Sequence, residues 1–295
     1  MDILISTALL NYTGLPTYIL TLYNQLVARK HKVTVYCPDS GQLASRMNTI
    51  TSLEFAGWPD VILAQHNTTL AREMKTKFHD IPMIFTSHGI LPEVLEQPPT
   101  DIEIDKYIAV SEEVALNLKT YGIEAEIIRN FIDIDRFQCK EPVREKPERL
   151  LFISNFTRWR TYEIIQKACK IMGIEFRHLG FETHPQFNVE NYINESDIVI
   201  SLGRGVLEAM ACDRPAIVFD RRRGDGYINE DIYRKSRMNN LSGRAFRINF
   251  TSETLMKEIE KYDPDDGIVN RNIILKHHNH VKAVDTIMEI IREMT

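Results

Sequence analysis

Short apolar strands alternate with helical stretches along most of this chain, and that alternation constrains the fold more than any other feature. The first strand is expected at 2–6, and a turn follows at 11–16. Over 17–29, apolar residues recur at helical spacing. Alternating strands and helices favour open parallel sheets over an all-α or all-β fold. Further strands are expected at 33–37, 61–64, 83–87, 106–110, 126–129, 150–154, 175–179, 197–201 and 216–219.

A polar, charged segment divides these elements into two series. Residues 138–149 contain two prolines and no apolar periodicity, which is typical of a linker. The 295 residues are enough for two domains with separate cores. We therefore expect a first Rossmann-like domain over 1–138, a linker over 139–149 and a second domain over 150–272, and the last stretch, 270–294, has a helical pattern.

Composition narrows the class of protein. With 43% hydrophobic residues and a formal net charge of −5, the chain is expected to be globular and lacks the basic excess of a nucleic-acid binder. No apolar run approaches the roughly 20 residues that span a bilayer. Asp2 stands where a signal peptide would carry positive charge, so we expect a cytoplasmic protein. The four cysteines are scattered without Cys-x-x-Cys spacing, so we expect free thiols. No nucleic-acid partner is expected.

One segment combines a glycine turn, a helix start and a single acid. After the strand 197–201, Gly203 and Gly205 allow a tight turn into a helix, whose first N–H groups attract anions. Arg204 adds a cation, and Glu208, one turn further, is placed to accept hydrogen bonds from a sugar diol. The segment is a candidate phosphate and ribose site in which Glu208 is dispensable for folding. The alternative is a glycine turn of the kind found in many α/β proteins.

The words Leu-Glu-Ala-Met-Ala-Cys at 207–212 and Pro-Ala-Ile-Val at 215–218 resemble the donor-site signature of retaining GT-B glycosyltransferases of the family-4 type. The resemblance implies an α/β GT-B fold, with two Rossmann-like doubly wound domains facing a central cleft. It also implies that Glu208 holds the ribose of a nucleotide-diphosphate sugar. The first domain would be the acceptor side, and a C-terminal helix over 273–295 would cross back to it.

The resemblance extends to two residues of the first domain. Thr13-Gly14 looks like a shortened form of the family's glycine loop, in which the backbone of Gly14 would approach the donor diphosphate. His88 ends the strand 83–87, where the family keeps a histidine near the donor sugar, and it is our catalytic candidate. The alternatives are a plain turn for Gly14 and a structural role for His88. His66 is a weaker candidate of the same kind.

Two departures from the family pattern concern the donor site. Asn155 stands in place of a phosphate-binding arginine, so Arg158 and Arg160 are the candidate diphosphate ligands, unless they form a solvated basic loop. Ile200 stands where the family has its first glutamate. Arg204 is expected to replace that polar group in part. Nucleotide binding should survive this change, whereas the contacts to the sugar are altered.

These observations indicate a hexosyltransferase-type enzyme (EC 2.4 class) that transfers a sugar to a hydroxyl acceptor, saccharide, lipid-linked or other. The resemblance implies retention of configuration, and no metal ion or cofactor is expected. The Asp133-Ile-Asp135 spacing suits a metal, but it lies in the segment leading toward the linker. The alternatives are a GT-B-like sugar-nucleotide epimerase and a non-catalytic nucleotide-sugar-binding relative.

A peripheral contact with anionic lipid is the last partner considered. Its candidate face consists of basic residues of the first domain, for which the alternative is ordinary solvated charge. These residues are Lys30, Lys32, Arg72, Lys75 and Lys77.

Overall fold

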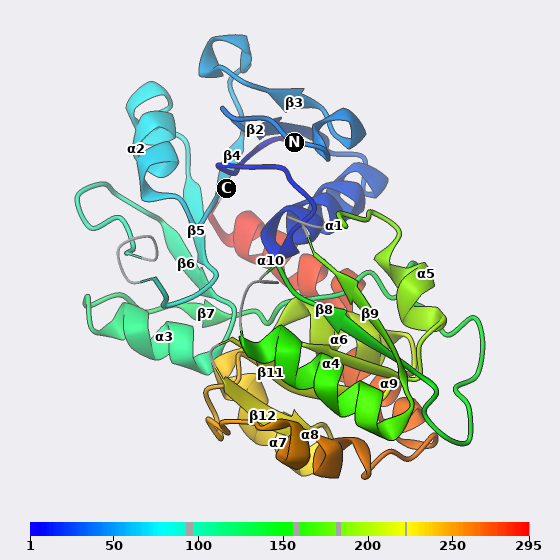
Figure 1. Cartoon of the computed structure of the whole chain (residues 1–295). Coiled ribbons are helices and arrows are strands. Elements are labelled where there is room, and N and C mark those ends of the chain that lie inside the picture. The colour runs from blue at the N-terminus through cyan, green and yellow to red at the C-terminus, as the bar shows by residue number, and fades with distance from the viewer. Residues whose placement is uncertain (93–96, 156–159, 181–183, 222, 295) are drawn as a thin grey trace. The chain divides into compact units, whose positions relative to one another are not determined.

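The computed structural model describes residues 1–92, 97–155, 160–180, 184–221 and 223–294 (Figure 1). The chain separates into two compact units. The first comprises Met1–Asn130 and His280–Thr295, and the second comprises Phe131–Asn279. Each has its own sheet and core, and each is described by itself.

The first unit is built on a seven-stranded sheet in the order β3-β2-β1-β4-β5-β6-β7, with every neighbouring pair parallel. The order reverses between β1 and β4, and in such sheets ligands bind outside the carboxyl ends of the strands at the reversal. The strands are β1 (Asp2–Ser6), β2 (Lys32–Tyr36), β3 (Thr49–Ile50), β4 (Val61–Gln65), β5 (Met83–Ser87), β6 (Lys106–Ala109) and β7 (Glu126–Ile127). The helices are α1 (Gly14–Ala28), α2 (Thr68–Lys77), α3 (Glu112–Lys119) and α10 (His280–Met294), with short 3-10 turns η1 (Ala44–Arg46) and η2 (Leu53–Phe55).

The C-terminal helix α10 belongs to the first unit and packs along α1. Its Val284 and Ile291 are fully buried, and Asp285 pairs with Arg29 at the end of α1 at 2.6 Å. The expected continuous helix over 270–294 is wrong, because the chain breaks at His278 and Asn279. There the His278 carbonyl accepts a hydrogen bond from the Ile132 N–H at 2.8 Å.

The second unit has a five-stranded sheet in the order β12-β11-β10-β8-β9, parallel except for the edge strand β12. Its order reverses between β8 and β10. The strands are β8 (Arg149–Ile153), β9 (Glu175–Leu179), β10 (Ile198–Ser201), β11 (Ala216–Asp220) and β12 (Arg223–Tyr227). The helices are α4 (Arg160–Met172), α5 (Val189–Asn194), α6 (Arg204–Ala211), α7 (Glu230–Ser236), α8 (Ser252–Ile259) and α9 (Asp266–His277), with the 3-10 turn η4 (Arg237–Asn239).

Helices cover both faces of this second sheet, and the strands are apolar on both faces for that reason. Leu150 and Phe152 of β8 pack in the core formed with α4 and α8. Leu151 between them packs in the opposite core with α6 and α9. The same alternation along β10 places Ile200 in the α4 and α8 core. The sheet is therefore doubly wound.

The boundary between the units differs from the expected linker. Residues 139–149 lie within the second unit, because the buried Asp197 carboxylate accepts from the N–H groups of Arg144, Glu148 and Arg149 at 2.9–3.2 Å. The Arg144 guanidinium adds a bond at 3.0 Å. Prolines and charges in this segment predict correctly that it forms no helix and almost no strand. They do not predict that it is held against the second unit by hydrogen bonds.

A second difference from the expected elements is the edge strand β12. Residues 223–227 form β12, which pairs antiparallel with β11. Asp225 is buried there and accepts from the Phe246 N–H at 2.9 Å. Its two glycines, one arginine and one aspartate hide this strand from hydrophobic periodicity, because side chains on an edge strand need not be apolar.

Asp197 and Glu195 offer a matched test of this packing. Asp197→Ala should lower the free energy of unfolding of the second unit by about 3–5 kcal/mol, since it leaves several buried donors without an acceptor. Glu195→Ala removes an exposed partner of Arg177 and should cost less than about 1 kcal/mol. Urea unfolding of both variants measures this. Equal losses would mean that Asp197 does not anchor residues 139–149.

Candidate functional site

The carboxyl edge of the second sheet carries the strongest candidate site. Ser201 ends β10 at the reversal of strand order, and α6 begins at Arg204. Gly203 has φ 53°, which favours glycine, and a Cβ on Gly205 would lie 2.2 Å from the Ser201 hydroxyl oxygen. Both glycines are therefore needed to bring the chain directly from β10 into α6, whose first N–H groups lie at this edge.

A buried ion pair joins the first and second turns of α6. The Arg204 Nε donates to the Glu208 Oε1 at 2.8 Å, and Arg204 and Glu208 are 9% and 8% exposed. Burial raises the pKa of Glu208 and lowers the pKa of Arg204, while each partner opposes the shift of the other. No hydrogen bond from the described residues reaches Glu208 Oε2, so this oxygen can accept one from a ligand hydroxyl.

Arg204 also fixes the start of the second unit. Its Nη1 donates to the carbonyl oxygen of Phe131 at 2.8 Å, in a bond buried from solvent. The sequence predicts Arg204 as a donor-site cation. Two of its nitrogens instead contact protein groups, so its main role in this geometry is to hold the Glu208 carboxylate and the Phe131 backbone.

A second pair, Arg136 and Glu190, strengthens the charge balance around Glu208. Arg136 donates to Glu190 through Nε at 3.1 Å and Nη2 at 2.8 Å. The Arg136 guanidinium also lies over the ring of Phe187, with its central carbon 4.2 Å from the ring centroid. Arg136 favours the charged Glu208 and Glu190 opposes it. This pair is not predicted from the sequence, because its two members lie 54 residues apart in the chain.

Next to α6, the end of β8 carries a polar network that the sequence also did not reveal. The Ser154 hydroxyl donates to Asp220 Oδ2 at 3.0 Å, and both residues are buried. Burial lowers the pKa of His178, and its Nε2 lies 2.9 Å from the Ser154 carbonyl oxygen, so the neutral ring donates there. This network holds the carboxyl ends of β8, β9 and β11 together.

The candidate diphosphate cations lie beyond β8. Arg160 is exposed and is the first residue of α4, the helix that follows β8 at the reversal of strand order. Arg158 lies outside the described residues. Ile200, which stands where the resemblance implies an acid, is fully buried in the apolar core, where a carboxylate would be desolvated. The strand thus offers no polar side chain at this position.

The first unit places Gly14 and His88 at one edge of its sheet. Gly14 is exposed and begins α1, and the Tyr18 ring, one turn later, lies 4.9 Å from the His88 ring in an edge-to-face contact. His88 follows β5, and its Nε2 lies 2.9 Å from Gln65 Oε1 at the end of β4. His66 lies 6.5 Å from the same ring. Gln65 and Tyr18 are further residues of this site that the sequence analysis missed.

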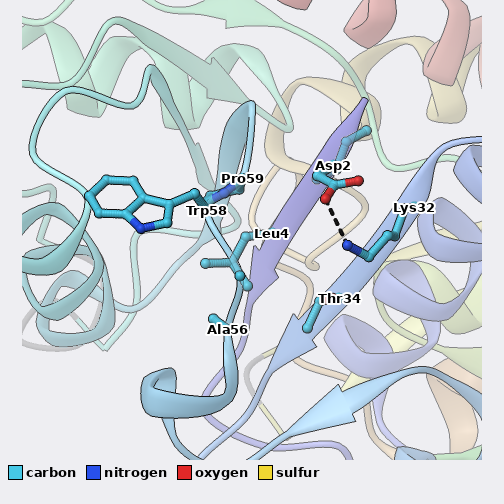
Figure 2. Close-up of a pocket in the computed structure, with 9 residues that line it drawn as sticks. Asp2, Leu4, Lys32, Thr34, Ala56, Trp58 and Pro59 are labelled. Carbon is cyan, nitrogen blue, oxygen red and sulfur yellow. Dashed lines mark hydrogen bonds and ion pairs between the residues drawn. The ribbon is translucent and has the colours of Figure 1, made fainter.

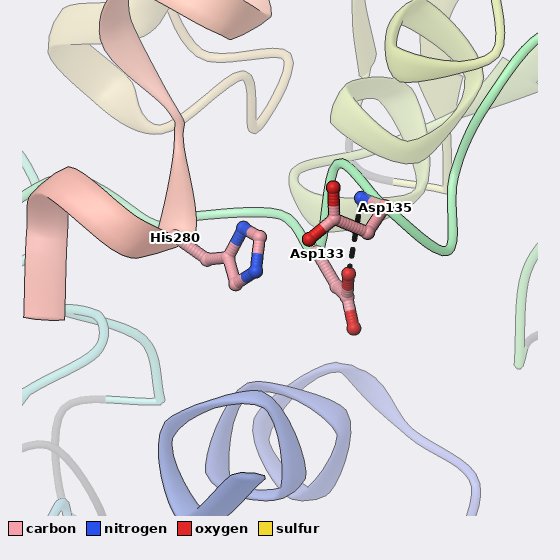
Figure 3. Close-up of side chains that lie close together, drawn as sticks. All are labelled: Asp133, Asp135 and His280. Atoms are coloured by element: carbon pink, nitrogen blue, oxygen red, sulfur yellow. Dashed lines mark hydrogen bonds between the residues drawn. The ribbon is translucent and has the colours of Figure 1, made fainter. Parts of the chain in front are cut away.

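Asp133 and Asp135, which have metal-box spacing, form a turn (Figure 3). Asp133 Oδ1 accepts from the backbone N–H groups of Asp135 at 3.2 Å and Arg136 at 3.0 Å. Asp135 is exposed. This oxygen of Asp133 is therefore engaged in shaping the start of the second unit.

A small pocket of the first unit lies at the opposite edge of its sheet (Figure 2). It is lined by the first residues of β1 and β2 and by Trp58, and Lys32 and Asp2 form an ion pair of 2.7 Å at its rim. Because ligands of such sheets bind at the carboxyl ends, this pocket is separate from the candidate site.

Most of the basic residues of the proposed face are engaged by other protein groups. Lys32 pairs with Asp2, Arg72 pairs with Asp101 at 2.8 Å, and Lys77 donates to the Leu53 carbonyl oxygen. Lys75 donates to the Ile81 carbonyl oxygen at 3.1 Å. None of the helices in the described part of the chain is long and apolar enough to cross a membrane.

Comparisons with known proteins show the fold. No protein-family model matches the chain, and no curated protein matches it. An α-glucosyltransferase in complex with UDP and a 13-mer DNA containing a HMU base matches with a TM-score of 0.66 at 12% identity, over 99% of both chains. CalG4, the calicheamicin glycosyltransferase, matches with a TM-score of 0.56 at 11% identity, over 98% of this chain and 97% of that one.

TarM from S. aureus, in complex with fondaparinux, α-GlcNAc-glycerol and UDP, matches with a TM-score of 0.51 at 13% identity, over 78% of this chain and 55% of that one. These likenesses, together with the two doubly wound units, confirm the expected α/β GT-B fold class.

The ion pair of α6 yields a stability prediction that replaces the expectation of a dispensable Glu208. Glu208→Ala should destabilise the second unit by about 3–5 kcal/mol, because it leaves Arg204 buried without its counter-charge. The double variant Arg204→Leu/Glu208→Leu should recover most of that loss, since no unpaired charge remains. Chemical unfolding of Arg204→Leu, Glu208→Leu and the double variant measures the coupling. Additive losses would show that the pair is not coupled.

Proposed function

We propose that the chain is a glycosyltransferase that transfers a sugar from a nucleotide-diphosphate sugar to a hydroxyl acceptor. The observation that carries the proposal is the Glu208 carboxylate, held by Arg204 one turn into α6 at the reversal of strand order. A carboxylate in this place suits a ribose diol, because charge-assisted hydrogen bonds are strong and directional. The UDP in the complexes of the similar α-glucosyltransferase supports this donor class.

The diphosphate is proposed to be held by protein groups, with no metal ion and no cofactor. Two helix starts of the second unit support this: α6 with Gly203 and Gly205, and α4 with Arg160. N–H groups and a guanidinium stabilise the charge that develops on a departing diphosphate.

For the transferred sugar, we propose a hexose, with retention of configuration. His88 is the proposed catalytic residue, because an imidazole at a strand end can exchange hydrogen bonds with a sugar hydroxyl near the reacting centre. The family-like words at 207–212 and 215–218 support retention. The buried Ile200 changes the sugar contacts relative to that family.

A saccharide or another small hydroxyl carrier is the proposed acceptor. DNA accompanies the similar α-glucosyltransferase, so nucleic acid must be tested as an acceptor here. Two features of this chain favour a different acceptor: acidic residues outnumber basic ones in the first unit, and several of its basic groups are paired. Because DNA is present in the complexes of the similar α-glucosyltransferase, a duplex with hydroxymethylated bases belongs in the acceptor panel.

The activity itself is tested by incubating the chain with UDP-hexoses and a panel of hydroxyl acceptors. We expect release of UDP, a glycoside with the anomeric configuration of the donor, and unchanged turnover after chelation with EDTA. A new sugar nucleotide without a glycoside would identify an epimerase. Binding without turnover would identify a non-catalytic relative, and loss of activity in EDTA would refute metal independence.

Arg160 and Lys170 offer a matched test of the phosphate contact, because both are exposed cations of α4 at opposite ends of the helix. Arg160→Ala should weaken UDP binding by about tenfold and leave uridine binding unchanged, since uridine has no phosphate. Lys170→Ala should change neither. Calorimetry with both ligands checks this. Equal losses for UDP and uridine in the Arg160 variant would exclude a phosphate contact.

A further inference from the structure

Basic residues gather around the edge strand β12 and the helix α7 that follows it (Figure 1). Residues 221–247 contain arginine or lysine at eight positions and an acid at three, in a chain whose formal net charge is −5. The acids on either side of Arg223 in the sequence, Asp220 and Asp225, are buried and accept backbone N–H groups at 2.6 and 2.9 Å. The exposed charge next to them is therefore that of the arginines.

Two of these arginines lie on paired segments of the chain. Gly224 of β12 and Ile248 exchange both backbone hydrogen bonds in an antiparallel bridge, at 3.0 and 2.7 Å. Arg223 and Arg247 each precede one residue of this bridge, which makes them diagonal neighbours across it. Diagonal neighbours lie about 7–8 Å apart, within reach of long side chains. Both arginines are exposed, so one small anion can be contacted by both guanidinium groups.

The backbone conformation at both arginines favours glycine. The angle φ is 128° at Arg223 and 57° at Arg247, a region in which a side chain strains the backbone. Within the part of the chain that the structure describes, neither side chain has a hydrogen bond or an ion pair that would offset this strain. Strained backbone of this kind is concentrated at functional sites. The two arginines are therefore better explained by a ligand than by the fold.

These arginines adjoin the proposed donor site within the second unit. Because β12 runs antiparallel to β11, Arg223 at its start lies at the carboxyl edge of the sheet. The loop after η4 connects this point to the glycine turn that begins α6. There the Gly203 N–H donates to the Leu241 carbonyl oxygen at 2.8 Å, and a Cβ on Gly243 would lie 2.5 Å from the Arg223 carbonyl oxygen. A group bound by Arg223 would thus be held beside the start of α6.

We propose that Arg223 and Arg247 form an anion site that binds a phosphate group of the acceptor. Guanidinium groups suit phosphate, because each can donate two parallel hydrogen bonds to its oxygens. The inference rests on the proposed function, since it takes the molecule held beside the donor to be the acceptor. It narrows the proposed small hydroxyl carrier to a phosphorylated one, and it gives the second unit a part in acceptor recognition.

Glycine variants remove the two charges without straining the fold. Arg223→Gly and Arg247→Gly relieve the positive φ, so their melting temperatures should not fall below that of the wild type. Lys30→Gly, which removes an exposed lysine at φ 65° in the first unit, is the control for this relief of strain. Arg234→Ala removes an exposed arginine of α7 that is paired with Asp231, and it is the control for binding.

Inorganic phosphate is the probe of the site, titrated into the UDP-saturated chain so that the proposed diphosphate site is filled. NMR follows the N–H signals of the arginine Nε atoms, and those of Arg223 and Arg247 are assigned by their loss in the glycine variants. We expect both signals to shift, and the phosphate affinity to fall by about tenfold in each variant. The two controls should bind phosphate as the wild type does. Unchanged phosphate affinity in both glycine variants would overturn the proposal.

The acceptor assay offers hydroxyl compounds in pairs that differ by one phosphate, such as glucose and glucose 6-phosphate, or glycerol and glycerol 3-phosphate. With a UDP-hexose as donor, we expect the phosphorylated member of a pair to have a KM at least about tenfold lower. Arg223→Gly and Arg247→Gly should abolish this preference and keep the affinity for UDP within about twofold of the wild type.

Equal use of both members of every pair would overturn the proposal. A large loss of UDP affinity in the glycine variants would also overturn it, because the arginines would then hold the diphosphate of the donor. The same holds if the two arginines are needed for binding an oligonucleotide or anionic lipid vesicles but not inorganic phosphate. A chain that turns over no nucleotide sugar would refute the proposed function instead, and the phosphate titration would still decide whether Arg223 and Arg247 form an anion site.

Discussion

The buried pair of Arg204 and Glu208 is the interaction on which the second unit and its candidate site both depend. A carboxylate that is 8% exposed is stable only with a counter-charge at hydrogen-bond distance, and Arg204 supplies it from the preceding helical turn. The same guanidinium holds the carbonyl of Phe131, the first residue of the second unit. One side chain therefore fixes both the carboxylate proposed to bind ribose and the backbone where the second unit begins.

This arrangement changes the roles that the sequence suggests for the donor corner. Arg204 is occupied by protein partners, so the cation proposed to meet the diphosphate is Arg160, on the helix that follows β8. Ile200 faces a core packed by α4 and α8, where an acidic side chain would be desolvated. Charge around Glu208 is balanced instead by the neighbouring pair of Arg136 and Glu190. The site that we propose for the nucleotide therefore has different polar groups around it than the sequence suggests.

Hydrophobic periodicity predicts most of the parallel strands, since buried strands must be apolar. The expected strand at 197–201 is observed as β10, Ile198–Ser201. Contacts that depend on distant residues are not visible in the sequence. The local pattern of residues 139–149 favours a linker, but Asp197 anchors this segment in the second unit. The local pattern of residues 270–294 favours one long helix, but the chain breaks between α9 and α10, where the His278 carbonyl accepts a hydrogen bond from Ile132. The glycine turn and Glu208 could be located from their motif, but the partners Arg136, Tyr18 and Gln65 come from other elements.

The central claim is that Glu208 is held to accept a hydrogen bond from the ribose of the donor. It is tested most directly by comparing, by calorimetry, the binding of UDP and of 2′,3′-dideoxy-UDP, which lacks the diol. The wild type should bind UDP more tightly by one to two orders of magnitude, corresponding to about 1.5–3 kcal/mol for a hydrogen bond to a charged group. Glu208→Gln, which keeps the shape of the side chain, should lose most of that difference. Equal affinities of the wild type for the two nucleotides would contradict the account.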